Sequence, residues 1–398
     1  MMSKVGSRLR DGLRALTEAR VGQISALDGL RAMAITLVIA GKSQNDFFFA
    51  AGPQTPHWFF STIGFGWIGV DLFFVLSGFL IGRILFQEIR ATGKLEVGSF
   101  LLKRGLRIWP LYFFICGLGL VQMISNHRWE GIASIIPDLT FTTNFFSEKL
   151  AFGSWSLSIE EQFYLLTSIA LFFALKRVKN LRKIFPLLGF LLLLAPLFRN
   201  LTWQYYLGHG VDPFYLEWEI VHSYFFTHYE GLVVGVAFAA ATVLLPKTAK
   251  LRSNFSLLLI AGIILTSIGV AFERLMFLYS LISLAFGLAV WHCLQRPKST
   301  VARFFSWPAF GVISRLSYGM YLWYRFPLWR IADFVSSHFS AWPSEIRFVL
   351  IFGIDFTLAA AAATVTFLIV ERPFLQLRSR IFAPARTERI QDGRLDYT

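Results

Sequence analysis

Charged side chains interrupt an apolar stretch near the N-terminus, where the hydropathy otherwise favours a membrane helix. Residues 27–46 carry Asp28, Arg31 and Lys42 within that stretch and Asp46 at its end. Arg31 and Lys42 are about three helical turns apart, which places them on one helix face at an axial separation of about 16 Å. Ionisable groups inside a membrane are costly and mark a candidate functional site. Snorkelling of the two cations to opposite interfaces is the structural alternative.

Two carboxylates in later apolar stretches could take part in acid–base chemistry. Asp71 lies among Val, Leu and Phe and needs a basic partner, for which Lys42 or an arginine is the expected type. Ser158 and Glu161 have the spacing of a capping box, which assigns Glu161 to a helix start. That assignment leaves Glu160 as the better candidate for an acid or base.

Small residues surround Asp71 and favour close contact between helices. Gly66, Gly69, Ser77 and Gly78 all lie in this one span. Small side chains allow membrane helices to approach closely, so packing explains these four residues without any chemistry.

A pair of arginines at the start of the third apolar stretch could bind an anionic ligand. Arg104 and Arg107 are three residues apart and share a helix face. Guanidinium groups bind phosphate oxygens through paired hydrogen bonds, so the pair suits a phosphorylated ligand. Anchoring at the inner membrane surface explains the same residues equally well. Near the last span, Glu371 precedes Pro373 and can pair with an arginine at the inner interface.

The composition indicates the elements that must position these residues. The chain has 398 residues, of which 55% are hydrophobic and 16% charged, and its mean hydropathy is +0.57. This profile is typical of a multi-pass membrane protein and excludes an ordinary soluble domain. The net charge of +14 therefore indicates basic cytoplasmic loops, and we expect no nucleic-acid partner. Cys116 and Cys293 lie in or next to apolar runs, so no disulfide framework is expected.

We predict an all-α integral membrane protein with about ten transmembrane helices. Helices need about 20 mostly apolar residues to cross a bilayer. The candidate spans are residues 27–46, 64–86, 107–126, 157–175, 184–200, 224–246, 254–272, 275–295, 309–332 and 348–370.

The distribution of Lys and Arg predicts that both termini are cytoplasmic. Loops on the predicted inner side hold 27 of these residues and outer loops hold 6. This orientation predicts an outer group of carboxylates and an inner group of arginines. Residues 1–23 read as a basic amphipathic leader on the inner membrane surface or as a disordered leader, residues 24–375 as the membrane domain, and residues 376–398 as a basic cytoplasmic tail.

Six motifs occur in the order found in the bacterial acyltransferase family 3, which this chain resembles over residues 24–375. They are Leu27-Asp-Gly-Leu-Arg31, Gly69-Val-Asp-Leu-Phe-Phe-Val-Leu-Ser-Gly-Phe79, Arg104-x-x-Arg107-Ile-x-Pro110, Trp155-Ser-Leu-Ser-Ile-Glu160-Glu-Gln-Phe-Tyr164, Ser317-Tyr-Gly-Met-Tyr-Leu322 and Val370-Glu-Arg-Pro373. The resemblance implies a ten-helix bacterial inner-membrane enzyme. Such an enzyme moves an acyl group, often acetyl, from cytoplasmic acyl-CoA to a hydroxyl of an extracytoplasmic glycan, lipid-linked sugar or glycoside.

The resemblance also implies roles for individual residues. Arg104 and Arg107 would hold the donor phosphates, Arg31 would line the path, and Glu160 and Asp71 would orient or assist. Lys42 would take the position of the base. The motifs add a further set of site residues: Asp28, Trp155, Ser156, Tyr318, Tyr324, Glu371 and Arg372. We expect no metal, because the sequence has no cluster with metal-ligand spacing.

The chain departs from the family pattern at the position of the base. In the family, a histidine follows the first arginine after ten residues, but Lys42 stands there. Tyr324 likewise replaces the histidine usual after a Tyr-Leu-Trp sequence. Lysine is a weak base at neutral pH because its reference pKa is about 10.4, and Asp46 and Asp71 would stabilise its ammonium form. A re-tuned catalyst, a member that has lost transfer and an altered residue all remain open.

The predicted function is therefore membrane O-acyl transfer from acetyl-CoA or another acyl-CoA to a carbohydrate or lipid-linked glycan. An inactive scaffold or binding protein of the same fold is the first alternative. A transporter, whose buried charges would relay protons or bind substrate, ranks last because we detect no internal repeat. The identity of the acceptor, the length of the acyl chain and the oligomeric state are not determined by these motifs.

Overall fold

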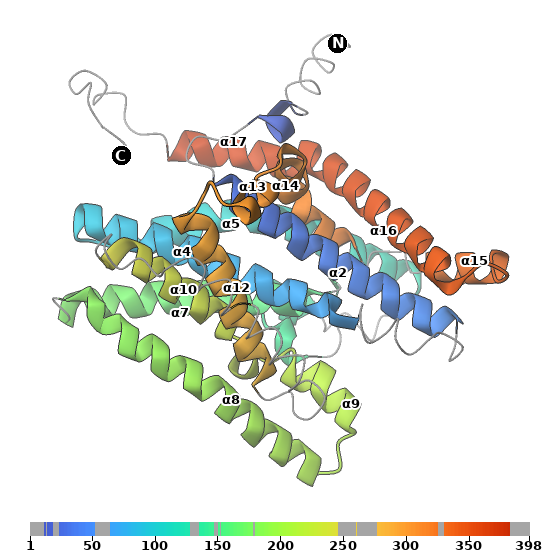
Figure 1. The fold of residues 1–398 in the computed structure, drawn as a ribbon, viewed down its shortest axis with the longest axis horizontal. Coiled ribbons are helices and arrows are strands. Elements are labelled where there is room, and N and C mark those ends of the chain that lie inside the picture. The colour runs from blue at the N-terminus through green and yellow to red at the C-terminus, as the bar shows by residue number, and fades with distance from the viewer. Residues whose placement is uncertain are drawn as a thin grey trace.

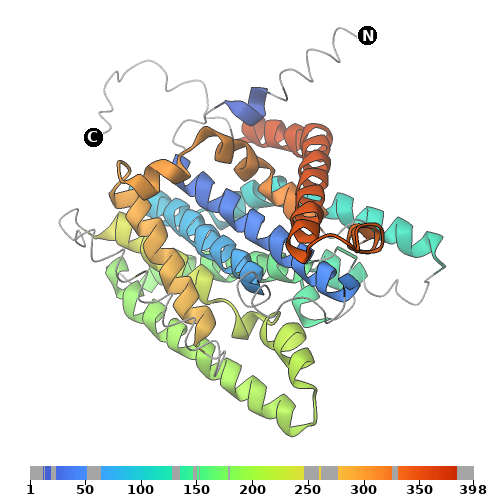
Figure 2. The same ribbon diagram turned by 45° about the vertical axis from the view of Figure 1, so that its right-hand side comes forward.

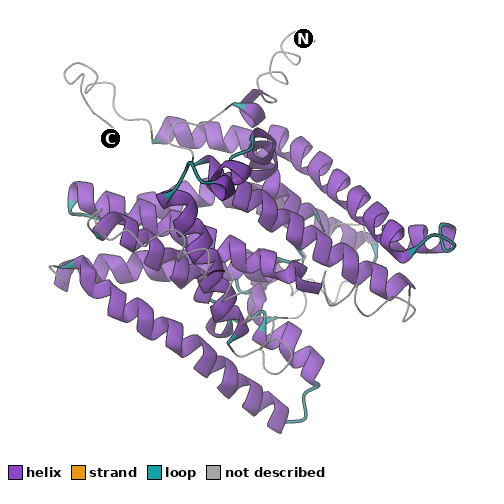
Figure 3. Ribbon diagram, in the orientation of Figure 1, coloured by secondary structure: helices purple, strands orange, loops and turns teal. Residues whose placement is uncertain are grey.

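The computed structural model describes helices and the short segments between them. It describes residues 12, 14–18, 24–51, 64–127, 135–146, 150–151, 153–177, 180–245, 260, 277–324 and 330–382. Figure 3 shows helices and loops but no strand among these residues. The all-α fold class is thereby confirmed for the described part of the chain.

Among the described residues, nine longer helices make up most of the bundle, which Figure 1 shows. They are α2 (Ser25–Ala51), α4 (Ile68–Thr92), α5 (Val97–Ser125), α7 (Ser154–Arg177), α8 (Ile184–Gly208), α10 (Glu230–Leu244), α12 (Leu278–Gln295), α14 (Pro308–Trp323) and α16 (Ser344–Thr366). The shorter helices are η2 (Gly64–Trp67), α6 (Ile135–Leu139), η4 (Thr143–Phe145), η5 (Leu181–Lys183), α9 (Pro213–Tyr215), η6 (Leu216–Val221), η7 (Phe225–Thr227), α13 (Thr300–Phe305), α15 (Arg330–His338), η8 (Phe367–Glu371) and α17 (Arg372–Ile381).

Glycines bring α4 very close to its neighbours α2 and α10. A Cβ atom on Gly69 would lie 2.5 Å from the Ala34 carbonyl oxygen, and one on Gly78 would lie 2.1 Å from that of Leu232. Neither distance leaves room for a side chain, so the backbones are in direct contact. The packing interpretation of these glycines is confirmed, and α4 forms the centre of the bundle.

Apolar side chains cover the outer faces of the bundle. Helices α8 and α16 lie on opposite sides in both views (Figures 1 and 2). Leu193 on α8 is 75% exposed and Val349 on α16 is 62% exposed, with further exposed apolar residues along both helices. Large exposed apolar surfaces of this kind are stable only when a membrane or another protein covers them. The chain is therefore a multi-pass membrane protein.

Six described helices are long and apolar enough to cross a membrane. They are Ile68–Thr92, Val97–Ser125, Ser154–Arg177, Leu181–Gly208, Leu278–Gln295 and Ser344–Ile381. Helix α10 is apolar but shorter, and the predicted span 254–272 lies outside the described residues except for residue 260. Ten spans therefore remain a prediction, as does the cytoplasmic location of the termini.

Contacts between helix ends agree with the predicted alternation of the spans. The Arg90 guanidinium at the end of α4 donates a hydrogen bond to the Val243 carbonyl oxygen at 2.9 Å, and the sequence analysis places both ends on the inner side. Phe47 at the end of α2 packs with Val335 and Phe348, whose segments are expected on the outer side. Helix ends expected on one side thus meet each other.

Part of the predicted N-terminal leader packs on the bundle. Of residues 1–23, the structure describes residues 12 and 14–18. Leu16 is buried, and the Arg315 guanidinium of α14 donates hydrogen bonds to the carbonyl oxygens of Ala15 (2.9 Å) and Glu18. These contacts tie the described part of the leader to α14.

Candidate functional site

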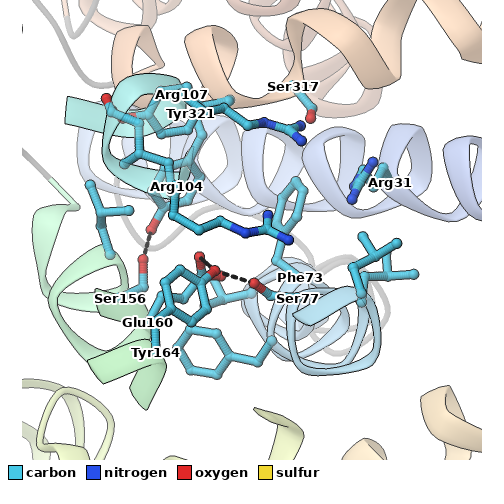
Figure 4. Close-up of a pocket in the computed structure, with 17 residues that line it drawn as sticks. Arg31, Phe73, Ser77, Arg104, Arg107, Ser156, Glu160, Tyr164, Ser317 and Tyr321 are labelled. Carbon is cyan, nitrogen blue, oxygen red and sulfur yellow. Dashed lines mark hydrogen bonds between the residues drawn. The ribbon is translucent and has the colours of Figure 1, made fainter. Parts of the chain in front are cut away.

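A cavity of about 120 Å³ gathers side chains from α2, α4, α5, α7 and α14 (Figure 4). Six predicted site residues line it: Arg31, Arg104, Arg107, Ser156, Glu160 and Tyr318. Its apolar wall includes Phe73, Phe74 and Leu80. The helices that supply these residues are far apart in the sequence, so only the folded bundle forms the cavity.

Glu160 lies with the arginines, which corrects the predicted separation of outer carboxylates from inner arginines. Figure 4 shows the Arg104 side chain extending across the cavity above Glu160 and Tyr164. The separation was predicted from depth counted along parallel spans, whereas the helices of the bundle cross at an angle (Figure 1). Crossing brings residues of different nominal depth to one cavity.

The cavity wall carries an excess of positive charge. Its lining holds three arginines and a single carboxylate, that of Glu160. Arg31 is partly neutralised because its guanidinium lies 3.8 Å from the Asp28 carboxylate, which also accepts a hydrogen bond from Ser314 at 2.9 Å. Arg104 and Arg107 are therefore the stronger candidates to bind an anion.

A hydrogen-bond chain joins α7 to α4 inside the cavity. The Tyr164 hydroxyl donates a hydrogen bond to Glu160 Oε2 at 2.7 Å and also pairs with the Ser77 hydroxyl. All three residues line the cavity. The sequence indicated a packing role for Ser77, but its hydroxyl forms part of the polar lining of the cavity.

The predicted capping box at the start of α7 is wrong, although it led to the choice of Glu160. Helix α7 begins at Ser154, so Ser158 lies inside the helix and its hydroxyl pairs with Thr143 Oγ1 at 2.8 Å. Glu161 accepts a hydrogen bond from Trp109 Nε1 at 3.0 Å. Both residues attach neighbouring segments to α7, so they do not cap it.

Tyrosines of α14 form another part of the wall. The Tyr318 hydroxyl donates to the Ile108 carbonyl oxygen at 2.8 Å, and the Tyr321 hydroxyl pairs with Ser156 and donates to the Gly153 carbonyl oxygen at 3.1 Å. Tyr321 was not among the predicted site residues. Tyr324 was a predicted site residue, but it lies outside the cavity lining and stacks on Tyr321 with ring centroids 5.4 Å apart.

Lys42 lies in a separate, buried ion cluster. Its ammonium is 2.7 Å from Asp46 and 3.1 Å from Asp355, and Ser43 donates a hydrogen bond to the same Asp355 oxygen at 2.6 Å. Asp46 was an expected partner, whereas Asp355 was not among the predicted site residues. Two carboxylates thus hold the Lys42 side chain away from the cavity lining.

Asp71 pairs with a histidine, so the predicted pair with Lys42 or an arginine is wrong. His228 Nε2 lies 2.9 Å from Asp71 Oδ1, and His228 Nδ1 lies 2.7 Å from the His222 carbonyl oxygen. Trp155 packs against both imidazoles, with ring centroids 4.7 and 5.8 Å away. The missed signal was the pair of histidines just before Glu230, of which His222 precedes the predicted span 224–246 and His228 lies within it.

The polar group of Asp71, His222 and His228 lies behind the cavity wall. Phe74 lines the cavity and contacts the His228 ring with centroids 5.5 Å apart. Beyond it, the Arg199 guanidinium forms a fully buried ion pair with Glu230. Asp71 and Trp155 thus belong to the support of the cavity rather than to its lining.

Glu371 and Arg372 lie after α16, where η8 ends and α17 begins. Glu371 is buried in the π-helical turn η8 and faces α14, where a Cβ atom on Gly319 would be 3.4 Å from its Oε1. An Arg372 nitrogen lies 3.0 Å from the position of a Cβ atom on Gly12. Neither residue lines the cavity.

Helices with apolar outer faces around a cavity lined by three arginines define a multi-pass membrane protein with a positively charged internal cavity. The chain belongs to membrane acyltransferase family 3, because the acyltransferase domain of that family matches residues 24–370. The resemblance predicted from the six motifs is confirmed.

Curated relatives of the chain include two O-acetyltransferases. The peptidoglycan O-acetyltransferase OatA of Listeria monocytogenes is 26% identical over 76% of this chain and 49% of its own length. The O-acetyltransferase OatA of Staphylococcus aureus is 26% identical over 90% of this chain and 58% of its own length. The chain thus spans about half the length of these relatives. No solved structure matches it.

Proposed function

We propose that the chain is a membrane O-acyltransferase that moves an acetyl or other acyl group from acyl-CoA to a carbohydrate hydroxyl. The observation that carries this proposal is the cavity in which Arg104 and Arg107 lie opposite Glu160. Guanidinium groups suit the donor phosphates, and a carboxylate within reach of the thioester can act in proton transfer. Membership of an acyltransferase family supports the same chemistry.

The acceptor in this proposal is a glycan outside the bacterial cytoplasmic membrane. The Listeria relative is named as a peptidoglycan O-acetyltransferase, which supports a glycan or lipid-linked glycan as the acceptor class. The donor would enter from the cytoplasm, where the loop charges predict the arginine end of the cavity to open. Arg31 would line the path between the two sides.

The test is acyl transfer by the purified full chain in lipid nanodiscs. We expect acetyl-CoA to release CoA faster when soluble peptidoglycan fragments are added, with acetyl esters appearing on the glycan. Glu160→Gln should reduce that rate by about a hundredfold or more, since acid–base catalysis contributes about 10²–10⁴-fold. The matched control is Glu345→Gln, which neutralises a carboxylate in the first turn of α16, outside the cavity lining.

A catalytically silent member of the family is the second candidate, and the Lys42 cluster favours it. Lys42 forms ion pairs with two carboxylates, at 2.7 and 3.1 Å, and lies outside the cavity lining, so it is not placed to act on a ligand in the cavity. A silent member would bind CoA but release none from acetyl-CoA with any glycan. That result would refute the transferase proposal.

A further inference from the structure

Three serines line the cavity, and their hydrogen bonds distinguish them. The Ser317 hydroxyl donates to the Ser314 carbonyl oxygen at 2.8 Å. Ser156 pairs with Tyr321, whose own proton goes to a backbone carbonyl. Ser77 is linked through Tyr164 to the carboxylate of Glu160. A backbone carbonyl cannot take up a proton at neutral pH, whereas a carboxylate can.

The direction of the Ser77 chain follows from the number of protons available. A tyrosine hydroxyl has one proton, and Tyr164 donates it to Glu160 Oε2 at 2.7 Å. The short contact between Ser77 and Tyr164 must therefore be a hydrogen bond donated by Ser77. The serine proton already points along a path that ends on a base.

We propose that Ser77 is a nucleophile that carries the acyl group as an ester between donor and acceptor. A hydroxyl linked to a base, with the base held by a third group, is the arrangement that activates serine nucleophiles. Here Tyr164 is the link and Glu160 is the base. This inference rests on the proposed acyl transfer and adds a covalent intermediate to it.

The reaction balances without any additional reagent. Ser77 Oγ attacks the thioester carbonyl carbon while its proton moves to Tyr164 and the Tyr164 proton moves to Glu160. The carbon–sulfur bond breaks, and the proton returns to the departing sulfur to give CoA and acyl-Ser77. The acceptor hydroxyl then attacks the carbonyl carbon of the serine ester and gives its proton to Glu160. The bond from that carbon to Ser77 Oγ breaks, and a proton returns from Glu160 through Tyr164 to Oγ, which yields the product ester and restores Ser77.

The surroundings of Ser77 support this role. The next residue, Gly78, packs directly against the Leu232 carbonyl oxygen and so fixes the backbone beside Ser77. Phe73 lies one helical turn before Ser77 on the same wall and offers an apolar contact for the acyl carbons. The Arg104 guanidinium extends toward the same space and would stabilise negative charge on the carbonyl oxygen.

The experiment traps the intermediate by leaving out the acceptor. The full chain in nanodiscs is incubated with radiolabelled acetyl-CoA, quenched in acid and mapped by mass spectrometry. We expect a burst of CoA equal to the amount of protein and an acetyl ester on the peptide that contains Ser77, cleaved by hydroxylamine. Addition of peptidoglycan fragments should discharge the label.

Variants separate the nucleophile from neighbouring serines. Ser77→Ala should abolish labelling, Ser77→Cys should restore it as a thioester, and Tyr164→Phe should slow it by about a hundredfold or more. Ser168→Ala is the matched control, because Ser168 is a buried serine of α7 that bonds the Leu165 carbonyl oxygen and lies outside the cavity lining.

Different failures have different meanings. Acetyl on another residue, or transfer by Ser77→Ala at the wild-type rate, would overturn the covalent intermediate and leave the proposed transferase intact. If the wild-type chain releases no CoA with or without glycan, the proposed function fails together with this inference.

Discussion

Removal of Arg104 and Arg107 should weaken donor binding far more than it affects folding. Both guanidiniums line the cavity, and neither forms an ion pair within 4.0 Å among the described residues. Hydrogen bonds to charged groups contribute about 1.5–3 kcal/mol each. Loss of two such contacts corresponds to about 3–6 kcal/mol, or about 10²–10⁴-fold in the Kd for CoA.

The structure also predicts how the single variants rank. Arg31 is 3.8 Å from Asp28, so part of its charge is already compensated and Arg31→Ala should cost less affinity than Arg104→Ala. The free energy of unfolding of the double variant should equal or exceed that of the wild type, because three like charges around one small cavity repel each other.

Equilibrium binding of CoA to the full chain in nanodiscs measures these effects, with thermal unfolding recorded in parallel. Arg380→Ala is the matched control, because Arg380 is an exposed arginine on α17. A double variant that unfolds normally and binds CoA as tightly as the wild type would refute the donor-site assignment. The arginines would then serve as membrane anchors.

Three further predictions concern the Lys42 cluster, Gly153 and the topology of the chain. Lys42→Met leaves the carboxylates of Asp46 and Asp355 without their cation and should lower the free energy of unfolding by about 3 kcal/mol, near the lower end for a buried pair because Asp46 is 25% exposed. The double variant with Asp355→Asn should regain part of this loss. Equal stability of Lys42→Met and the wild type in denaturant titrations would contradict the ion cluster. Gly153→Ala should destabilise by about 1–2 kcal/mol, because Gly153 has φ +79° and the new Cβ would lie 3.1 Å from a tyrosine hydroxyl; unchanged thermal unfolding would argue against this strain. A cysteine at position 145 should react with an impermeant reagent added outside cells, whereas one at position 180 should not, and the reverse pattern would invert the predicted topology.

The sequence by itself determined the class of protein and the kinds of residue in its site. Apolar runs of membrane-spanning length predicted an all-helical membrane bundle, because backbone polar groups in lipid must be satisfied within each span. The arginines of the third span predicted an anion site from residue type alone. The six motifs identified the family without any knowledge of contacts, since motif order is a property of the chain.

Only the tertiary structure decided which of these residues meet. Glu160 lies beside the arginines because the helices cross. Asp71 pairs with His228, which is 157 residues away in the sequence. Lys42 pairs with a second carboxylate, that of Asp355, which is 313 residues away in the sequence. Hydropathy indicates which residues enter the membrane, but it carries no information on which helix faces which. That choice depends on contacts such as Gly78 against Leu232, where the absence of a side chain lets two backbones touch and thereby sets the position of Ser77.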